Sequence, residues 1–153
     1  MAQKSKKAFI IETALPPFLE NGFKGTSIDM VVKKCSVSKP TVYNHFPDKS
    51  ALMLAVLEYW IETNKPLIAP IKDESALFSF AKTRWLSDDA VRFYALVIGE
   101  GWRFPRAKTL FWEQFDGKWR KALTYLREHT PGLHQAPCEP ILDQLLLNRL
   151  RQL

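Results

Sequence analysis

Three helix-start signals stand close together in residues 26–52, TSIDMVVKKCSVSKPTVYNHFPDKSAL, and they limit the possible fold more than any other feature. Thr26-Ser27, Ser38 and Asp48 each place a side-chain oxygen just before an apolar helical stripe. Such an oxygen accepts one of the free N–H groups at a helix N-terminus, so each position is a typical N-cap. Pro40 falls in the first turn of the middle helix, where its missing N–H costs nothing. The segment therefore predicts two short helices joined by a tight turn, with a further helix after Asp48.

The rest of the sequence also has helical periodicity. No run of four or more residues alternates cleanly between apolar and polar types, and no hairpin dipeptide joins two such runs. Apolar stripes instead indicate helical stretches over residues 7–21, 90–104, 110–126 and 141–150. We therefore predict an all-α fold.

The first of these helices contains Pro16-Pro17 in its interior. Each proline lacks an N–H, and its ring clashes with the carbonyl four residues back, which costs roughly 3 kcal/mol in a helix interior. We therefore expect a kink or break near Leu15. Asn21-Gly22 is expected to end the helix, because glycine readily takes a left-handed backbone conformation.

Pro66 and Pro70 follow a strongly amphipathic stretch and mark the expected seam between domains. We expect an N-terminal helix-turn-helix domain over residues 1–49, a linking helix over 50–65 and a C-terminal helical domain over 66–153. With 153 residues, 46% of them hydrophobic, the chain is long enough to bury a core without disulfides.

Several classes of protein are disfavoured by what the sequence lacks. No apolar run is long enough for a membrane span, and the charged start differs from a signal peptide, so we expect a cytoplasmic protein with no membrane partner. Cys35 and Cys138 lack CxxC spacing, which fits a reduced protein without a metal site. No nucleophile elbow, P-loop or HExxH motif occurs, so we expect neither an enzyme nor a cofactor.

Positive charge is unevenly distributed along the chain. Lysine and arginine total 22 against 16 acidic residues, a net charge of +6. Eight lysines and four acidic residues fall within residues 1–50, whereas all eight arginines come after residue 83. A basic N-terminal third suggests a polyanionic partner, of which nucleic acid is the commonest. The bidentate arginine–guanine contact is unavailable to this third, so sequence preference would depend on a lysine or on Asn44.

The middle helix of the 26–52 segment has the size and the side chains of a DNA-recognition helix. A major groove about 12 Å wide admits one α-helix, which enters N-terminus first in helix-turn-helix proteins. Hydrogen-bonding side chains occupy the outward positions of this helix: Lys39, Thr41, Tyr43, Asn44 and His45. They suit base edges and phosphates, although a packed helix face is the alternative for Tyr43 and His45.

Residues 22–52, GFKGTSIDMVVKKCSVSKPTVYNHFPDKSAL, closely resemble the DNA-binding domain of the TetR family of bacterial repressors. The matching positions are Gly22-Phe23, Thr26-Ser27, Val37-Ser38, Thr41-Val42-Tyr43, His45-Phe46, Lys49 and Leu52. Ser36 stands where the family carries a turn glycine. We therefore expect a left-handed serine there, at a cost of about 1 kcal/mol.

The resemblance implies contacts with double-stranded DNA. These would be phosphates for Thr26, Ser27 and Lys49, base edges for Lys39, Pro40 and Thr41, and the DNA backbone for Tyr43 and His45. It also implies a repressor that binds a palindromic operator as a homodimer and is released by a small molecule. The apolar faces of residues 110–126 and 141–150 are the expected dimer contact. The alternative of a different class is a helical small-molecule or partner-binding protein whose helix-turn-helix serves mainly as a scaffold.

Aromatic and charged residues of the C-terminal domain form the candidate effector site: Trp85, Glu100, Trp102, Arg103, Phe111 and Phe115. Such a set would make a mainly apolar pocket with a few orienting polar groups, suited to a small apolar or aromatic effector. Two alternatives stay open, namely that the rings are plain core and that Glu100 and Arg103 pair on a solvated edge. Residues 100–105 are also similar to a Glu-x-x-Arg-Phe-Pro stretch in AcrR-like members of the family.

Overall fold

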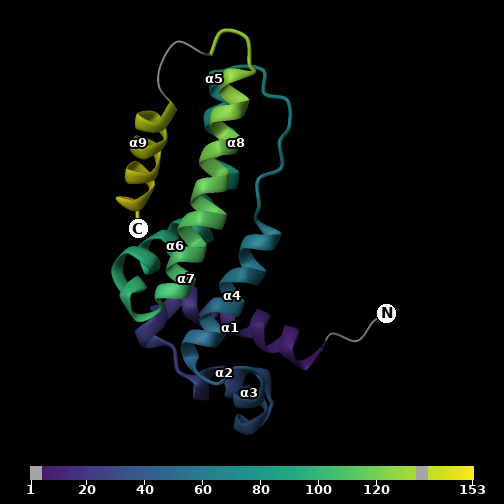
Figure 1. Cartoon of the computed structure of the whole chain (residues 1–153). Helices are drawn as coiled ribbons and strands as arrows, with labels where there is room; N and C mark the ends of the chain where they lie inside the picture. Colours follow the sequence, from purple (N-terminus) through teal and green to yellow (C-terminus); the bar gives the residue numbers. More distant parts are fainter. Residues whose placement is uncertain (1–4, 134–137) are drawn as a thin grey trace.

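The computed structural model describes residues 5–133 and 138–153, and every regular element within them is helical (Figure 1). The N-terminal part consists of α1 (Lys6–Gly25), α2 (Ile28–Cys35), α3 (Lys39–His45) and α4 (Lys49–Thr63). The C-terminal part consists of α5 (Glu74–Phe80), α6 (Asp88–Glu100), α7 (Pro105–Leu110), α8 (Gly117–Glu128) and α9 (Cys138–Leu150). The prediction of an all-α protein is confirmed.

Side-chain caps begin the short helices of the N-terminal part, as expected. Ser27 accepts the N–H of Met30, Ser38 accepts that of Thr41, and Asp48 accepts that of Ala51. The turn between α2 and α3 contains a left-handed Ser36 with φ 52° and ψ 32°. The expected strain at this position is therefore present in the structure.

The expected break near Leu15 is wrong. Helical backbone geometry continues through Pro16-Pro17, and the interruption lies instead at Gly22, with φ 72° and ψ −177°. Ala14 and Phe18, on either side of the prolines, are buried in the core. Because tertiary packing of an apolar face supplies most of the stability of a helix in a protein, it outweighs the local penalty of the two prolines.

The C-terminal part is arranged around one long helical column. α7 continues through a π-helical segment, Phe111–Asp116, directly into α8. Figure 1 shows this column reaching away from α2 and α3, with α9 beside it and α1 lying between the helix-turn-helix and the C-terminal helices. A further π-helical segment, Ala81–Trp85, extends α5.

Two element boundaries differ from the sequence expectation. The stretch expected over 90–104 divides into α6, which ends at Glu100, and a single 3-10 turn, Gly101–Arg103. Glycine weakens a helix interior, so Gly99 and Gly101 explain the early end. The linking helix expected over 50–65 is α4, Lys49–Thr63.

Candidate nucleic-acid interface

Helix α3 presents a polar face to solvent because its apolar side chains hold it against the rest of the fold. Val42 is fully buried and Phe46, directly after the helix, is 2% exposed. The opposite face carries the expected candidates. Lys39, Pro40, Tyr43, Asn44 and His45 are exposed, and Thr41 is partly buried. The structure therefore brings these side chains together on one exposed helix.

The N-terminal end of α3 is the most polar part of this surface. Lys39 Nζ lies 2.8 Å from Asp29 Oδ1 of α2, and both side chains are at least half exposed. Hydrogen bonding and charge attraction from Asp29 raise the pKa of Lys39. An exposed ion pair is worth little in water, so Lys39 is free to exchange this partner for a phosphate or a base. Thr41 Oγ1 lies 2.7 Å from Ser38 Oγ, which keeps its hydroxyl at the helix start.

Thr26 does not occupy the position expected of a phosphate contact. Its side chain is 1% exposed, and Oγ1 donates to the carbonyl oxygens of Pro17 at 2.9 Å and Gly22 at 2.8 Å. The hydroxyl thus joins the start of α2 to the body of α1. Ser27 is exposed and caps α2, so it is the residue of the pair that faces solvent.

Lys49 also points into the fold more than expected. Its ammonium donates to the carbonyl oxygens of Phe23 at 2.8 Å and Thr26 at 3.0 Å, and lies 4.4 Å from the centre of the Phe23 ring. Burial lowers the pKa of Lys49, against the opposing effect of the Glu100 charge. An ammonium has three N–H groups, so a single one remains for a phosphate. In this structure, Lys49 therefore stabilises the C-terminal end of α1.

Further lysines are exposed near these helices. Lys24 in the last turn of α1 and Lys33 and Lys34 in the last turn of α2 all face solvent. The helix-turn-helix motif does not identify these lysines as candidates. The clustering of lysines in the N-terminal third was the one feature of the sequence that could have indicated them. They add to the positive charge of the N-terminal part of the molecule.

The six candidate effector residues do not form a pocket. Trp85, Phe111 and Phe115 are fully buried, with ring centroids of Phe111 and Phe115 only 5.2 Å apart. Trp102 is 70% exposed, because α6 ends before it. The rings pack against one another and form plain core, which is the alternative given for this cluster.

The two charged candidates also have other partners. Glu100 accepts the backbone N–H of Phe23 and that of Lys24. Arg103 Nε lies 3.7 Å from the Glu100 carboxylate, and its guanidinium stacks 4.1 Å from the centre of the Trp102 ring. Glu100 therefore belongs to the contact with the N-terminal helices, which the sequence analysis missed.

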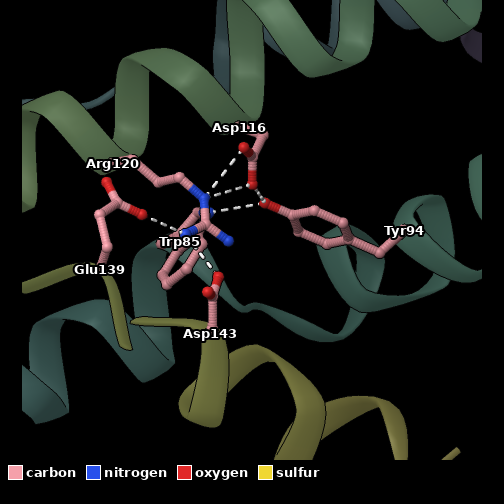
Figure 2. A network of polar contacts seen from close by, with 6 residues as sticks. All are labelled: Trp85, Tyr94, Asp116, Arg120, Glu139 and Asp143. Atoms are coloured by element: carbon pink, nitrogen blue, oxygen red, sulfur yellow. Dashed lines mark hydrogen bonds and ion pairs between the residues drawn. The ribbon is translucent and has the colours of Figure 1, made fainter. Parts of the chain in front are cut away.

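A buried polar network connects Trp85, one of the candidate effector residues, to Tyr94, Asp116 and Arg120 (Figure 2). Trp85 Nε1 donates to the Tyr94 hydroxyl at 2.9 Å, and this hydroxyl donates to Asp116 Oδ1 at 2.6 Å. Arg120 donates through Nε to both oxygens of Asp116, at 3.1 and 3.0 Å. Burial and the neighbouring Asp116 raise the pKa of Tyr94, so the hydroxyl stays neutral.

Arg120 carries this network to α9. Its guanidinium lies 2.7 Å from Glu139 and 2.8 Å from Asp143, and Figure 2 shows it between these two carboxylates and Asp116. Burial acts to lower the pKa of Arg120, but the three carboxylates outweigh it and the pKa is raised. The residues therefore join α6, α8 and α9 and have a structural role.

Two hollows lie outside this core. An enclosed one between α5, α8 and α9 has a volume of about 10 Å³, which holds one water at most. A wider and open one of about 470 Å³ lies between α4 and α7, where it is lined by Leu54, Glu58, Pro105, Arg106, Thr109, Leu110 and Glu113. No helix among residues 5–133 and 138–153 has the length and apolar character to cross a membrane.

Comparison with known proteins matches the N-terminal region to a family model. Residues 10–56 match the model described as bacterial regulatory proteins, tetR family. The chain is 41% identical over 69 residues to the uncharacterized HTH-type transcriptional regulator YuxN of Bacillus subtilis. It is 35% identical over 71 residues to the HTH-type transcriptional regulator RutR of Escherichia coli. These matches cover 45% and 46% of this chain but only 24% and 32% of the two relatives, so the chain spans a minor part of their length.

The fold extends the likeness beyond the matched segment. Salmonella enterica GusR aligns with a TM-score of 0.68 over 95% of this chain and 80% of that one, at 22% sequence identity. At this identity the alignment describes the fold alone. The alignment covers the C-terminal helices as well as the helix-turn-helix.

Proposed function

Because the chain belongs to the tetR family of bacterial regulatory proteins, we propose that it is a transcriptional repressor that binds a palindromic operator as a homodimer. The observation that carries the proposal is α3 itself. It holds Lys39, Thr41, Tyr43 and Asn44 on one side while Val42 packs beneath them. A polar helix held in this way has the dimensions and donors that a major groove requires.

DNA binding is tested with duplexes selected by the full chain from a random library. Affinity is expected to fall steeply as salt rises, because each neutralised phosphate releases counterions. Lys39→Ala is expected to lose roughly 1–3 kcal/mol on the selected site and to relax preference at one base position. Lys82→Ala is the matched control, since Lys82 is an exposed lysine of the C-terminal part. Failure to select any sequence, or equal loss from both variants, contradicts the proposal and favours a helical binding protein with a structural helix-turn-helix.

The homodimer is proposed to use the outer faces of α8 and α9. Most apolar residues of α8 are buried within their own chain, whereas in α9 only Leu142 and Leu146 are buried. Tyr125 and Leu147 are about half exposed and are the most exposed apolar side chains of the two helices. Light scattering should show a dimer at micromolar concentration, and Leu147→Glu should give folded monomers. A monomeric unmodified chain contradicts this part of the proposal.

Release by a small apolar or aromatic effector is the remaining part of the proposal. Because the aromatic core is closed, we propose the hollow between α4 and α7 as the effector site, where Arg106, Leu54 and Leu110 are among the lining residues. A ligand there would contact the helix that begins beside α3, which gives it a route to the DNA-binding part. A panel of planar aromatic carboxylates is the probe, and release of the selected DNA is the readout. Release that survives Arg106→Ala unchanged argues against this site.

A further inference from the structure

The end of α6 is joined to the end of α1 by one carboxylate. Glu100 Oε1 accepts the backbone N–H of Phe23 at 2.9 Å, and Oε2 accepts that of Lys24 at 2.8 Å. These residues are 76 and 77 positions apart in the chain. In Figure 1, α1 lies between α2–α3 and the C-terminal helices. A charged acceptor held by two backbone donors is among the stronger hydrogen-bonding arrangements in proteins.

Gly22 makes this contact possible in two ways. Its φ of 72° interrupts the helix, and the N–H groups of the two following residues donate to Glu100. A Cβ at Gly22 would lie 2.5 Å from Glu100 Oε1 and 3.8 Å from the Leu96 side chain. Both the backbone angle and the close approach therefore require glycine at this position.

Phe23 is held from the other side as well. Its ring lies 4.9 Å from the ring of Phe104, which follows α6 and the 3-10 turn, and 6.1 Å from that of Phe18. Lys49 Nζ donates to its carbonyl oxygen. The last turn of α1 is thus held by the C-terminal part through Glu100 and Phe104, and by α4 through Lys49. The hydrogen bonds and the ring contact together define its orientation.

We propose that Glu100 is a positioning residue that sets the orientation of the helix-turn-helix on the C-terminal part, and so the spacing of the two half-sites that the dimer accepts. This inference rests on the proposed function. In a dimer, the distance between recognition helices must match half-sites about one helical turn of DNA apart. The C-terminal parts fix the dimer, and Glu100 fixes each α1 relative to them. Loss of the carboxylate loosens the orientation without altering α3.

The test measures spacing preference with the full chain. The selected operator and versions of it with longer and shorter spacers between the half-sites are the probes, and random-sequence duplex is the reference. Glu100→Gln keeps the size of the side chain but replaces one acceptor oxygen with a donor. Glu74→Gln, at an exposed carboxylate in the first turn of α5, is the control with the same change of charge.

Glu100→Gln is expected to narrow the affinity ratio between matched and mismatched spacers by roughly tenfold, a typical size for coupling between two parts of a protein. Its affinity for random duplex should stay near that of the unmodified chain, because phosphate contacts need no fixed spacing. Glu74→Gln should keep the original ratio. Glu100→Asp, which shortens the side chain but keeps the charge, should give a smaller change in the same direction.

The outcomes separate this inference from the proposed function. If the unmodified chain binds operators with all spacers equally well, both the proposed dimeric operator binding and this inference are wrong. If the unmodified chain has a steep spacer preference and Glu100→Gln leaves it unchanged, only the inference is wrong. Thermal unfolding identifies variants that do not fold. Failure of both Glu100→Gln and Glu100→Asp to fold also overturns the inference, since a residue that only orients two folded parts is dispensable for folding.

Discussion

The helix caps of the N-terminal part and the buried network of the C-terminal part use polar side chains over different distances. In the N-terminal part, Ser27, Ser38 and Asp48 each bond to a backbone N–H three residues further along the chain. In the C-terminal part, the Tyr94 hydroxyl bonds to Asp116 across 22 positions, and Arg120 bonds to Glu139 across 19. The first set shapes single helices, whereas the second joins helices to each other.

This difference governs how each part should respond to substitution. A cap contributes about 1 kcal/mol, and its loss affects one helix end. A buried network depends on all of its members, because removing one leaves the others without partners in a medium of low dielectric constant. The C-terminal part should therefore show the larger and more cooperative losses.

The largest effect is expected from Asp116→Ala. The carboxylate is the shared acceptor of Tyr94 and Arg120, so its removal leaves a buried hydroxyl and a largely buried guanidinium short of a partner. We expect a loss of about 3 kcal/mol in unfolding free energy, measured by chemical denaturation.

Asp143→Ala is the control for Asp116→Ala, because Asp143 also pairs with Arg120 but its side chain is 60% exposed. It should lose less than about 1 kcal/mol. Equal losses for the two aspartates would mean that the buried network has no special role and that the contrast between the two parts is wrong.

Thr26→Val tests the buried hydroxyl of the N-terminal part. The valine keeps the shape but cannot donate to the Pro17 and Gly22 carbonyl oxygens, so we expect a loss of about 2 kcal/mol in unfolding free energy. Its effect should exceed that of Ser27→Ala, which removes an exposed cap worth about 1 kcal/mol. Unchanged stability with weaker DNA binding would restore Thr26 as a phosphate contact.

Alkaline pH should weaken the C-terminal part through Tyr94. Burial and Asp116 raise the pKa of the folded-state hydroxyl above its value of about 10 in an unfolded chain. A group whose pKa is higher in the folded than in the unfolded state contributes its full stabilisation at pH values below its unfolded-state pKa. This stabilisation is lost as the pH rises above that pKa. The unfolding free energy should thus fall by about 1.4 kcal/mol per pH unit above pH 10 from this group.

Tyr94→Phe is the comparison for this pH dependence. The variant is less stable at neutral pH because it lacks two hydrogen bonds, so the slopes rather than the absolute values are compared. Denaturation curves between pH 9 and 11 should show a shallower slope for the phenylalanine variant. Parallel slopes would show that Tyr94 ionises as readily in the folded chain as in the unfolded one.

The smallest effect is a gain at the turn of the N-terminal part. Ser36 has φ 52°, a conformation that glycine adopts without strain, and Ser36→Gly should raise the unfolding free energy by less than about 1 kcal/mol. Ser79→Gly, at an exposed helical position of α5, should instead lower it by about 0.5–1 kcal/mol. Thermal or chemical unfolding measures both, and a loss at Ser36 would contradict the strain assigned to it.

The sequence was most informative where structure depends on neighbours in the chain. The caps at Ser38 and Asp48 and the exposed face of α3 follow from local rules, the left-handed Ser36 follows from the resemblance to the family, and all are present. The burial of Thr26 and the inward direction of Lys49 were not predicted, because their partners come from other helices. A motif assigns a residue type to a position but does not say which neighbour satisfies it.

The arrangement of the candidate effector residues was not predicted for the same reason. Composition indicated aromatic rings and charges in one region, and either a pocket or a core was consistent with that. The buried positions of Trp85 and Phe115 depend on how α4, α6 and α8 meet, which periodicity does not specify. The contact of Glu100 with α1 spans half of the chain and had no local signal.

The π-helical segment Phe111–Asp116 affects which side chains of the α7–α8 column face the core. In an α-helix each residue turns by about 100°, so one added residue would rotate every later side chain away from the core. A π turn takes up an added residue within its wider hydrogen-bonded ring. Ala107 before the segment and Leu123 after it are both buried, so the two stretches keep their apolar faces inward. Removing one residue from the segment should then give an unbroken α-helix in which the apolar face of α8 still points toward the core.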